Sequence, residues 1–316
     1  MESTTAGAEY GMKRRLAFLG FFKRLLKEKP LGTAGLAITI AFLMVGILAD
    51  LLAPYGVNET TLVFLGPPSK EFILGTDNLG RDLLSRIIYG ARISVIIGLS
   101  ATTLATLYSV LIGTISGYIG GRLDMAIQRF VDAWMCLPGL IMSILLISII
   151  GTGMVQTIFV ISLILGIGGS RIVRGAVIAI KSNAYIDAAS AIGCSRIKIL
   201  VFHVLPNVMA TVVTIFSLRV AEAILIEASL SFLGLGIPPP NPSWGAMLGR
   251  SGRDYMFLAP WMVIWPGLAI AIVVYGINMF GDAMRDILDP KLKGGVGRYS
   301  GGHKLMKKKK RSKAAL

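Results

Sequence analysis

Charge-free apolar stretches alternate with polar segments along most of the chain. The first stretch covers residues 31–49, and its 19 residues are enough, at about 1.5 Å each, to cross a hydrocarbon core of about 30 Å. Residues 93–121 give a second stretch of 29 residues, which predicts a helix that is tilted or extends beyond the lipid. Residues 133–170 are too long for one crossing, and the Gly-Thr-Gly segment at 151–153 predicts a turn between a third and a fourth helix.

Two further apolar stretches lie in the carboxyl-terminal half of the chain. They cover about 208–233 and 255–281, and the second contains Pro260 and Pro266. The pattern as a whole predicts an all-α integral membrane protein with six transmembrane helices. An even number of crossings puts both termini on the same side of the membrane.

Polar ends frame this six-helix domain, which we place at residues 31–290. Residues 1–30 form a basic leader in which apolar side chains recur at helical spacing, and this predicts an amphipathic helix at the membrane surface. These side chains are Phe18, Phe21, Phe22 and Leu25. The first apolar stretch starts late, which favours an uncleaved anchor over a signal peptide. Residues 291–316 form a basic tail that we expect to be flexible.

The composition agrees with a membrane protein. Of the 316 residues, 54% are apolar and only 16% are charged, against about 25% charged residues in soluble domains. The net charge of +15 could indicate nucleic-acid binding, but the basic residues gather at the two ends of the chain. A contact with the anionic cytoplasmic surface of the membrane is the better interpretation.

The distribution of basic residues predicts that both termini are cytoplasmic, because short loops rich in Lys and Arg stay in the cytoplasm. The leader carries seven such residues, the segment after the last stretch carries eleven, and residues 171–198 carry five. The loops at 54–91 and 237–254, with Arg92 at the edge of the first, share six. We therefore expect these two loops to lie outside, and the longest inner loop, at about 175–206, to face the cytoplasm.

This inner loop predicts two short helices. Asn183 can cap the first helix, Asp187 lies in its first turn, and Gly193 can end it in a left-handed conformation. Ser195 can cap the second helix, and Pro206 is expected to break or kink it before the membrane. Because several side chains of the first helix are small, it could enter a groove on another protein. From these features alone, a docking element and a plain helical connector are both open.

Three segments resemble the permeases of ATP-binding cassette importers. The inner loop is similar to the EAA loop of that family, with an aspartate where the family usually has glutamate. Its matching positions are Tyr185, Asp187, Ala188, Ala189, Gly193 and Pro206. An outer-loop motif consists of Gly75, Thr76, Asp77, Gly80, Arg81 and Asp82, with Ser85 and Arg86 following. The third segment, 227–245, begins with Glu227-Ala228-Ser229 and ends with Trp244-Gly245. Together they resemble the C-type subunit of dipeptide, oligopeptide and nickel importers.

The resemblance implies a type I importer permease in the cytoplasmic membrane of a prokaryote. Such a permease pairs with a second, related permease to form one pore. It also works with two cytoplasmic ATPases, which bind ATP and Mg²⁺, and with an extracytoplasmic solute-binding protein. The chain itself would hold no cofactor and catalyse no reaction. The loop at about 181–206 would be the coupling helix through which the ATPases switch the bundle between two states.

Peptides are the substrate class that the resemblance favours. Importers of nickel, glutathione and some oligosaccharides have a similar subunit, so the motifs leave the exact substrate open. The sequence contains no GxxxxGK[ST] loop for ATP. His203 and His303 have no cysteine or histidine at ligand spacing, so no metal site is expected. Cys136 falls in the predicted third helix and Cys194 on the cytoplasmic side, which makes a disulfide between them improbable by placement.

Three charged residues lie within the fifth apolar stretch, namely Arg219, Glu222 and Glu227. Arg219 follows Pro206 by about 20 Å of helix, so these side chains should face a cavity or pair with each other. Arg219 and Glu222 share a helix face. They could line the substrate path and hold the ends of a zwitterionic peptide, or they could form an internal pair or a contact with the partner permease.

Two other transport mechanisms are alternatives. A proton-coupled secondary transporter would use Glu222 or Glu227 as a proton relay. A passive channel would need regular rings of side chains or a pore loop to select its solute, and the sequence contains neither.

Overall fold

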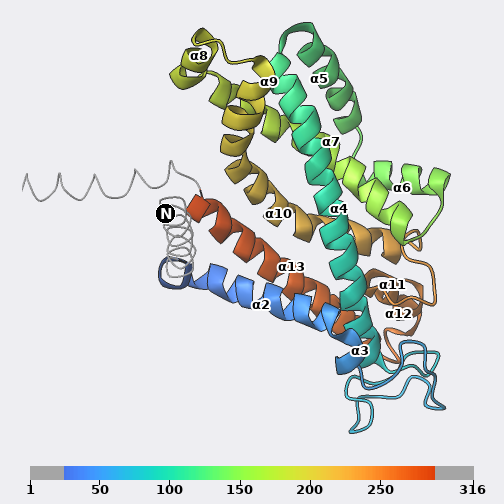
Figure 1. Ribbon diagram of the computed structural model, residues 1–316. Helices are drawn as coiled ribbons and strands as arrows, with labels where there is room; N and C mark the ends of the chain where they lie inside the picture. The colour runs from blue at the N-terminus through green and yellow to red at the C-terminus, as the bar shows by residue number, and fades with distance from the viewer. Residues whose placement is uncertain (1–24, 289–316) are drawn as a thin grey trace, which may run out of the picture.

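A computed structural model describes residues 25–288, which form helices, connecting loops and two isolated β-bridges, Thr60 with Arg81 and Thr76 with Asp82 (Figure 1). In chain order the helices are α2 (Pro30–Ile47), α3 (Ala49–Leu52), α4 (Leu83–Ile119), α5 (Gly121–Met135), α6 (Gly139–Ile150), α7 (Met154–Lys181), α8 (Ala184–Ala191), α9 (Arg196–Ile199), the π-helix η1 (Leu200–Val204), α10 (Leu205–Phe232), α11 (Trp244–Leu248), α12 (Arg250–Tyr255) and α13 (Trp261–Leu288). Most of the predicted amphipathic leader, including Phe18, Phe21 and Phe22, and the tail at 291–316 lie outside the described residues.

Five helical segments are long and apolar enough to cross a membrane: α2, α4, α7, the run Arg196–Phe232 and α13. Helices α5 and α6 are long and apolar enough for a sixth crossing only when they are taken together. The two helices meet at an angle of 89°, so this crossing would be a broken one. The third helix predicted to begin at residue 133 as one uninterrupted helix is therefore wrong. Helix α5 already begins at Gly121, and the chain breaks between α5 and α6, where Pro138 has no amide proton to continue a helix. The predicted turn at 151–153 is confirmed between α6 and α7.

Two other predicted boundaries differ from the structure. Helix α4 begins at Leu83, so the outer loop predicted at 54–91 ends at residue 82. Arg86 and Arg92 made the start of this helix look like a loop, but both side chains are paired with carboxylates. Helix α13 begins and ends several residues later than the predicted stretch at 255–281.

Helix α4 packs along α7 through small residues. A Cβ on Gly113 of α4 would lie 2.5 Å from the carbonyl oxygen of Ser170, so only glycine allows the two backbones to come this close. Ser109 adds a 2.8 Å hydrogen bond to the carbonyl oxygen of Gly166. Close packing and interhelical hydrogen bonds are the forces that associate helices in lipid, where the hydrophobic effect between helices is absent.

Helix α2 lies along α13 (Figure 1). Lys29, which precedes α2, forms a 2.6 Å ion pair with Asp286 near the end of α13. The first and last helices of the described chain therefore begin and end side by side, as an even number of crossings requires.

Helix α5 is rich in charges, and α7 neutralises two of them. Arg174 donates hydrogen bonds of 2.7 and 2.6 Å to the two carboxylate oxygens of Asp124, and Arg171 pairs with Asp132. Ser116 of α4 also donates to Asp124. Because these carboxylates have partners, α5 can lie beside α7 despite its polar sequence.

The predicted outer and inner loops lie at opposite ends of the bundle. The loop before α4 gathers with α11 and α12 at one end, and α8 and α9 lie at the other (Figure 1). Trp261 at the start of α13 donates a 3.2 Å hydrogen bond to the carbonyl oxygen of Thr76. This bond joins the start of α13 to the loop before α4. This arrangement agrees with the sidedness that the basic residues predict.

Candidate functional site

Helix α8 forms the tip of the inner loop. Ile186 and Ala189 are buried in a cluster with side chains of α7, η1 and α10. Tyr185, Asp187 and Ala188 are exposed and form the outward face of the helix. Of the small residues predicted to meet a partner, Ala189 therefore packs inward, and its small side chain lets α8 lie close to the bundle.

The sequence predicts two of the three helix ends in this loop correctly. Gly193 has a φ of +86°, so the left-handed end of α8 is confirmed. Ser195 caps α9 by accepting a hydrogen bond from the amide of Lys198, as predicted. The predicted cap by Asn183 is wrong. Its side-chain amide donates instead to the carbonyl oxygens of Ala179 and Ile180 at the end of α7.

Three side-chain contacts attach the inner loop to the membrane helices. The hydroxyl of Tyr118, on α4, donates a 2.8 Å hydrogen bond to the carbonyl oxygen of Arg196. The ammonium of Lys181, on α7, donates a 2.7 Å bond to the carbonyl oxygen of Tyr118. Asn207 of α10 donates to the hydroxyl of Tyr185 at 3.4 Å. Only the third contact involves α8 itself, since the first reaches α9 and the second joins α7 to α4. A displacement of α8 would therefore act directly on α10 through Tyr185, and on α7 and α10 through its buried face.

Pro206 lies inside a continuous helical run, so the predicted break is wrong. Helix α9 leads through η1 into α10, and Pro206 occupies the first turn of α10. In η1 the hydrogen bonds span five residues, as between the amide of Leu205 and the carbonyl oxygen of Leu200. This wider turn directly before the proline lets the helix continue although proline offers no amide proton.

Arg219 and Glu222 form an ion pair on the surface of α10. Nη1 of Arg219 donates a 2.7 Å hydrogen bond to the Glu222 carboxylate. Both side chains line a cavity of about 280 Å³ beside the break between α5 and α6. The cavity wall also includes Trp134, Met135, Leu137, Pro138, Met142 and Ile164. The Glu222 side chain is 50% exposed in the isolated chain, so the pair faces out of this subunit.

Glu227 lies apart from this pair. Its side chain is buried, and its Oε1 accepts hydrogen bonds of 2.7 Å from Ser231 and 2.8 Å from Ser243. Its Oε2 has no hydrogen-bond partner among the described residues. The structure thus brings Arg219 and Glu222 together but places Glu227 at the contact between α10 and α11.

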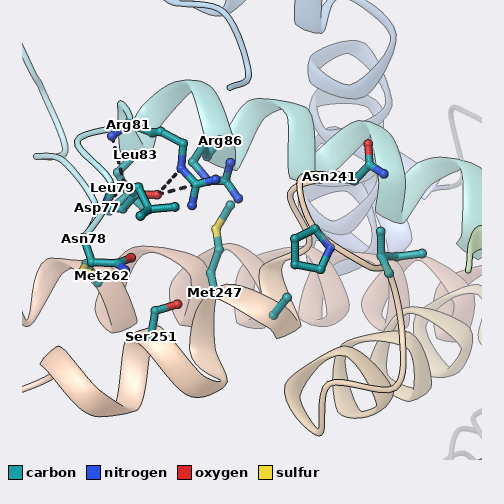
Figure 2. Close-up of a pocket in the computed structure, with 13 residues that line it drawn as sticks. Asp77, Asn78, Leu79, Arg81, Leu83, Arg86, Asn241, Met247, Ser251 and Met262 are labelled. Carbon is teal, nitrogen blue, oxygen red and sulfur yellow. Dashed lines mark hydrogen bonds and ion pairs between the residues drawn. The ribbon is translucent and has the colours of Figure 1, made fainter. Parts of the chain in front are cut away.

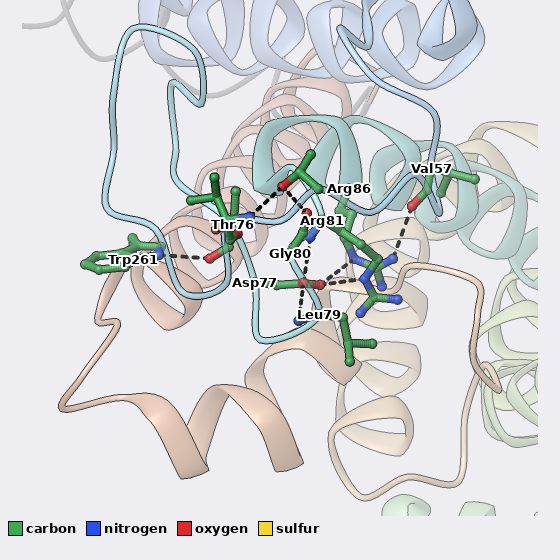
Figure 3. A network of polar contacts seen from close by, with 10 residues as sticks. Val57, Thr76, Asp77, Leu79, Gly80, Arg81, Arg86 and Trp261 are labelled. Atoms are coloured by element: carbon green, nitrogen blue, oxygen red, sulfur yellow. Dashed lines mark hydrogen bonds and ion pairs between the residues drawn. The ribbon is translucent and has the colours of Figure 1, made fainter.

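Thr76 of the outer-loop motif attaches this loop to the bundle (Figure 3). Its hydroxyl donates a 2.7 Å hydrogen bond to the carbonyl oxygen of Val63 and accepts one of 2.7 Å from the amide of Gly66. Its own carbonyl oxygen accepts the bond from Trp261. All hydrogen-bonding groups of this buried threonine therefore serve the fold of the loop.

Asp77 is the centre of a second network in the motif (Figure 3). Its Oδ1 accepts bonds of 2.8 Å from the amide of Leu79 and 3.0 Å from the amide of Arg81. Its Oδ2 accepts a 2.7 Å bond from Nε of Arg81 and lies 3.6 Å from Nε of Arg86. One buried carboxylate thus holds a tight turn and two guanidinium groups.

The other motif residues also have structural roles. Gly80 has a φ of +72°, and a Cβ there would lie 2.3 Å from the carbonyl oxygen of Thr61. Gly75 also has a positive φ, of +84°. Asp82 caps α4 by accepting bonds of 2.8 Å from the amide and 2.7 Å from the hydroxyl of Ser85.

Sequence reasoning gave no role to three residues that complete these networks, namely Arg86, Ser243 and Asp124. For Arg86 the usable signal was its position directly after the outer-loop motif. Ser243 and Asp124 carry no local signal, because the side chains they bond are 16 and 50 positions away. Cys136 and Cys194 are both free, and within residues 25–288 no group of three His, Cys, Asp or Glu side chains is arranged to hold a metal ion.

The chain matches a known family and several characterised relatives. The family model described as "Binding-protein-dependent transport system inner membrane component" matches residues 109–294. The dipeptide transport system permease protein DppC of Alkalihalophilus pseudofirmus is 40% identical over 273 residues, which cover 86% of this chain and 89% of the relative. The oligopeptide transport system permease protein OppC of Bacillus subtilis is 38% identical and covers 84% and 88%. The glutathione transport system permease protein GsiD of Pectobacterium atrosepticum is 36% identical and covers 86% and 91%.

A solved structure is similar in fold. It is a chain of the MetNI methionine ABC transporter in an inward-facing conformation, with a TM-score of 0.54 and 16% sequence identity. The match covers 65% of this chain and 96% of the other. The two chains therefore share a fold over the matched part.

Proposed function

Because the chain belongs to the inner membrane components of binding-protein-dependent transport systems, we propose that it carries di- and oligopeptides across the bacterial inner membrane. It is a multi-pass, non-catalytic permease subunit of an ATP-binding cassette importer. In our proposal, residues 31–290 form its permease domain, with the six-helix topology and cytoplasmic termini of a type I importer. The observation that carries the peptide assignment is the identity of 36–40% to permeases named for dipeptide, oligopeptide and glutathione transport.

The proposed transporter contains four other subunits. A second, related permease shares the pore, two cytoplasmic ATPases bind ATP and Mg²⁺, and a solute-binding protein delivers the peptide from outside. The exposed apolar side chains of α6 support a second permease, because this short helix projects from the bundle at the bend (Figure 1). They are Leu140, Ile141, Leu145, Ile149 and Ile150.

The inner loop at about 181–206 is the proposed contact with the ATPases. Tyr185, Asp187 and Ala188 give α8 an exposed face, its buried face packs against α7 and α10, and Asn207 of α10 contacts Tyr185. Closure of the ATPase pair would push α8 as one piece, and the attached helices would follow. The bundle would thus alternate between inward and outward access.

Arg219 and Glu222 are the proposed contact with the peptide in the membrane. Their ion pair lines a cavity of about 280 Å³ at the bend, and Glu222 faces out of the subunit. An ion pair at this depth is favourable only if it faces protein or water. A pore shared with a second permease would supply that environment. The carboxylate of a zwitterionic peptide could then pair with Arg219, and its ammonium group could pair with Glu222.

Transport by the assembled complex in lipid vesicles tests the proposal. With the binding protein and a labelled dipeptide outside, uptake should require ATP on the ATPase side and should continue in the presence of a protonophore. Uptake that stops with the protonophore and ignores ATP would instead indicate a proton-coupled transporter. Nickel rather than peptides bound to the docking binding protein would contradict the peptide assignment and leave the mechanism intact.

A further inference from the structure

A polar pocket lies at the outer end of the bundle (Figure 2). It has a volume of about 220 Å³ and is bounded by the outer-loop motif, the start of α4, the segment before α11, and helices α11 to α13. Leu79, Pro239 and Asn241 are exposed and form its rim. Leu83, Met247 and Met262 are buried and form its floor. The pocket therefore opens away from the membrane and is closed toward it.

The charged side chains in this pocket are not balanced. Arg81 and Arg86 both line it, and both pair with the single carboxylate of Asp77 (Figures 2 and 3). The Arg86 side chain is only 9% exposed, and its other bond is a 3.3 Å contact from Nη1 to the carbonyl oxygen of Val57. Nη1 and Nη2 of Arg81 and Nη2 of Arg86 have no hydrogen-bond partner among residues 25–288. Two guanidinium groups thus share one carboxylate, which leaves one positive charge in excess among the residues that line the pocket.

This excess differs from the other arginine pairs of the described chain. Arg92 with Asp50, Arg174 with Asp124, and Arg219 with Glu222 are each one arginine to one carboxylate. A buried charge that shares its only carboxylate with a second cation is incompletely compensated, and a carboxylate that enters would complete the compensation and meet guanidinium donors that favour planar, two-point contacts. The chemistry of the pocket is therefore that of a carboxylate receptor.

The closed floor favours an anchored carboxylate over one in transit, because a solute that entered from outside would find no continuation toward the membrane. We propose that the pocket receives an acidic side chain of the solute-binding protein when that protein docks on the outer face. This inference rests on the proposed function, which brings a binding protein to this side. The rim, formed by both outer loops, would contact the protein surface around that side chain.

Docking of the binding protein to the whole transporter in nanodiscs tests the inference. Arg86→Gln removes the excess charge, and we expect it to weaken docking by about tenfold or more, the loss typical when one partner of a buried charge pair is removed. Arg92→Gln, on the same helix and with its own carboxylate, is the matched control and should dock like the wild type. Sodium acetate should weaken wild-type docking more than sodium chloride of equal ionic strength, and this difference should disappear in Arg86→Gln.

A second variant keeps the test decisive if Arg86→Gln does not assemble. Ser251 lines the pocket and is half-buried, so Ser251→Glu places a carboxylate of this chain in the site and should block docking without removing either arginine. Docking of Arg86→Gln or Ser251→Glu at wild-type affinity would overturn the inference. If such a variant also showed reduced peptide uptake, the carboxylate in the pocket would be that of the peptide. A wild-type complex that neither docks a binding protein nor uses ATP for uptake would contradict the proposed function, and the inference with it.

Discussion

Ser243 donates a 2.8 Å hydrogen bond to the buried carboxylate of Glu227, which lies 16 positions earlier in the chain. The same serine caps α11, and the same carboxylate oxygen accepts a bond from Ser231. Two residues of the family-like segment 227–245 thus fasten the outer helices α11 and α12 to the membrane helix α10. The carboxylate belongs to the support of the outer face and not to the charged pair at the bend.

Removing this contact should loosen the outer face. We expect Ser243→Ala to destabilise the attachment by about 1–3 kcal/mol, because it leaves the buried carboxylate with one donor fewer and α11 without its cap. Hydrogen exchange of the amides at 237–255 in nanodiscs would measure the change. Ser229→Ala is the control, since Ser229 is half-buried and its hydroxyl bonds only within its own helix. Equal exchange in both variants would show that the contact does not hold α11.

The contact between α4 and α7 should tolerate no side chain at Gly113. A Cβ there would lie 2.5 Å from a backbone oxygen of α7, so we expect Gly113→Ala to destabilise the subunit by about 1–3 kcal/mol. Gly175→Ala on α7 is the matched control, because nothing lies within 4 Å of its Cβ position. Thermal unfolding in detergent would compare the two variants. A Gly113→Ala protein as stable as Gly175→Ala would mean that the helices can separate at no cost.

The exposed face of α8 should transmit the force of the ATPases. Asp187→Lys and Ala188→Trp change its charge and shape without touching the buried Ile186 and Ala189. We expect peptide uptake per ATP hydrolysed to fall by about tenfold, the loss of one or more interface hot spots. Leu62→Trp, on the exposed outer loop, is the control for a bulky replacement. Fully coupled uptake in both α8 variants would exclude this helix as the coupling element.

Replacement of Glu222 separates the two roles that the charged pair could have. Glu222→Gln leaves Arg219 without its carboxylate at membrane depth, and we expect assembly with the second permease to persist while ATP-driven uptake falls. Size-exclusion chromatography and vesicle uptake would measure the two properties, and Thr214→Val, at a half-buried position of the same helix, is the control. Lost assembly would indicate a structural contact between the permeases. Normal assembly with normal uptake would contradict both roles.

One ion pair joins α3, which lies outside the membrane-crossing helices, to α4 and gives a prediction for pH. Arg92 donates hydrogen bonds of 3.1 and 2.7 Å to Asp50, and these bonds hold the pKa of the Asp50 carboxyl below its ordinary value of 3.8. The charged form of Asp50 is therefore favoured in the folded chain. The contribution of the ion pair to stability is complete when the pH is above the ordinary pKa, and it is lost as the pH falls through the lowered pKa of the folded chain. The difference in melting temperature between the wild type and Asp50→Asn should thus be constant from neutral to mildly acidic pH and shrink only in strong acid.

The positions of most membrane helices could be predicted from the sequence. Apolar stretches mark α2 and α10 to within a few residues, and they mark α7 and α13 with one or both ends displaced, because the lipid imposes a length and a composition on any crossing helix. The left-handed glycine at 193 and the serine cap at 195 were also predictable, since both depend only on the local backbone.

The bend between α5 and α6 could not be predicted in this way. The charges between residues 122 and 132 indicate a loop when each is counted as exposed, but Asp124 and Asp132 are paired with arginines of α7. Such partners come from another part of the chain, so hydropathy alone counts a neutralised charge as a solvated one. The roles of Glu227 and Arg86 were hidden for the same reason, because burial and pairing across the fold decide whether a charge lines a path or supports a loop.

The π-helix η1 has a consequence for the direction in which Arg219 and Glu222 point. A π-turn encloses one residue more than an α-turn, and each residue of an α-helix rotates the following side chains by about 100°. The single additional peptide unit before Pro206 therefore sets the azimuth at which Arg219 and Glu222 emerge in the middle of the membrane. A one-residue deletion on the cytoplasmic side would turn this pair away from the bend without altering any residue near it.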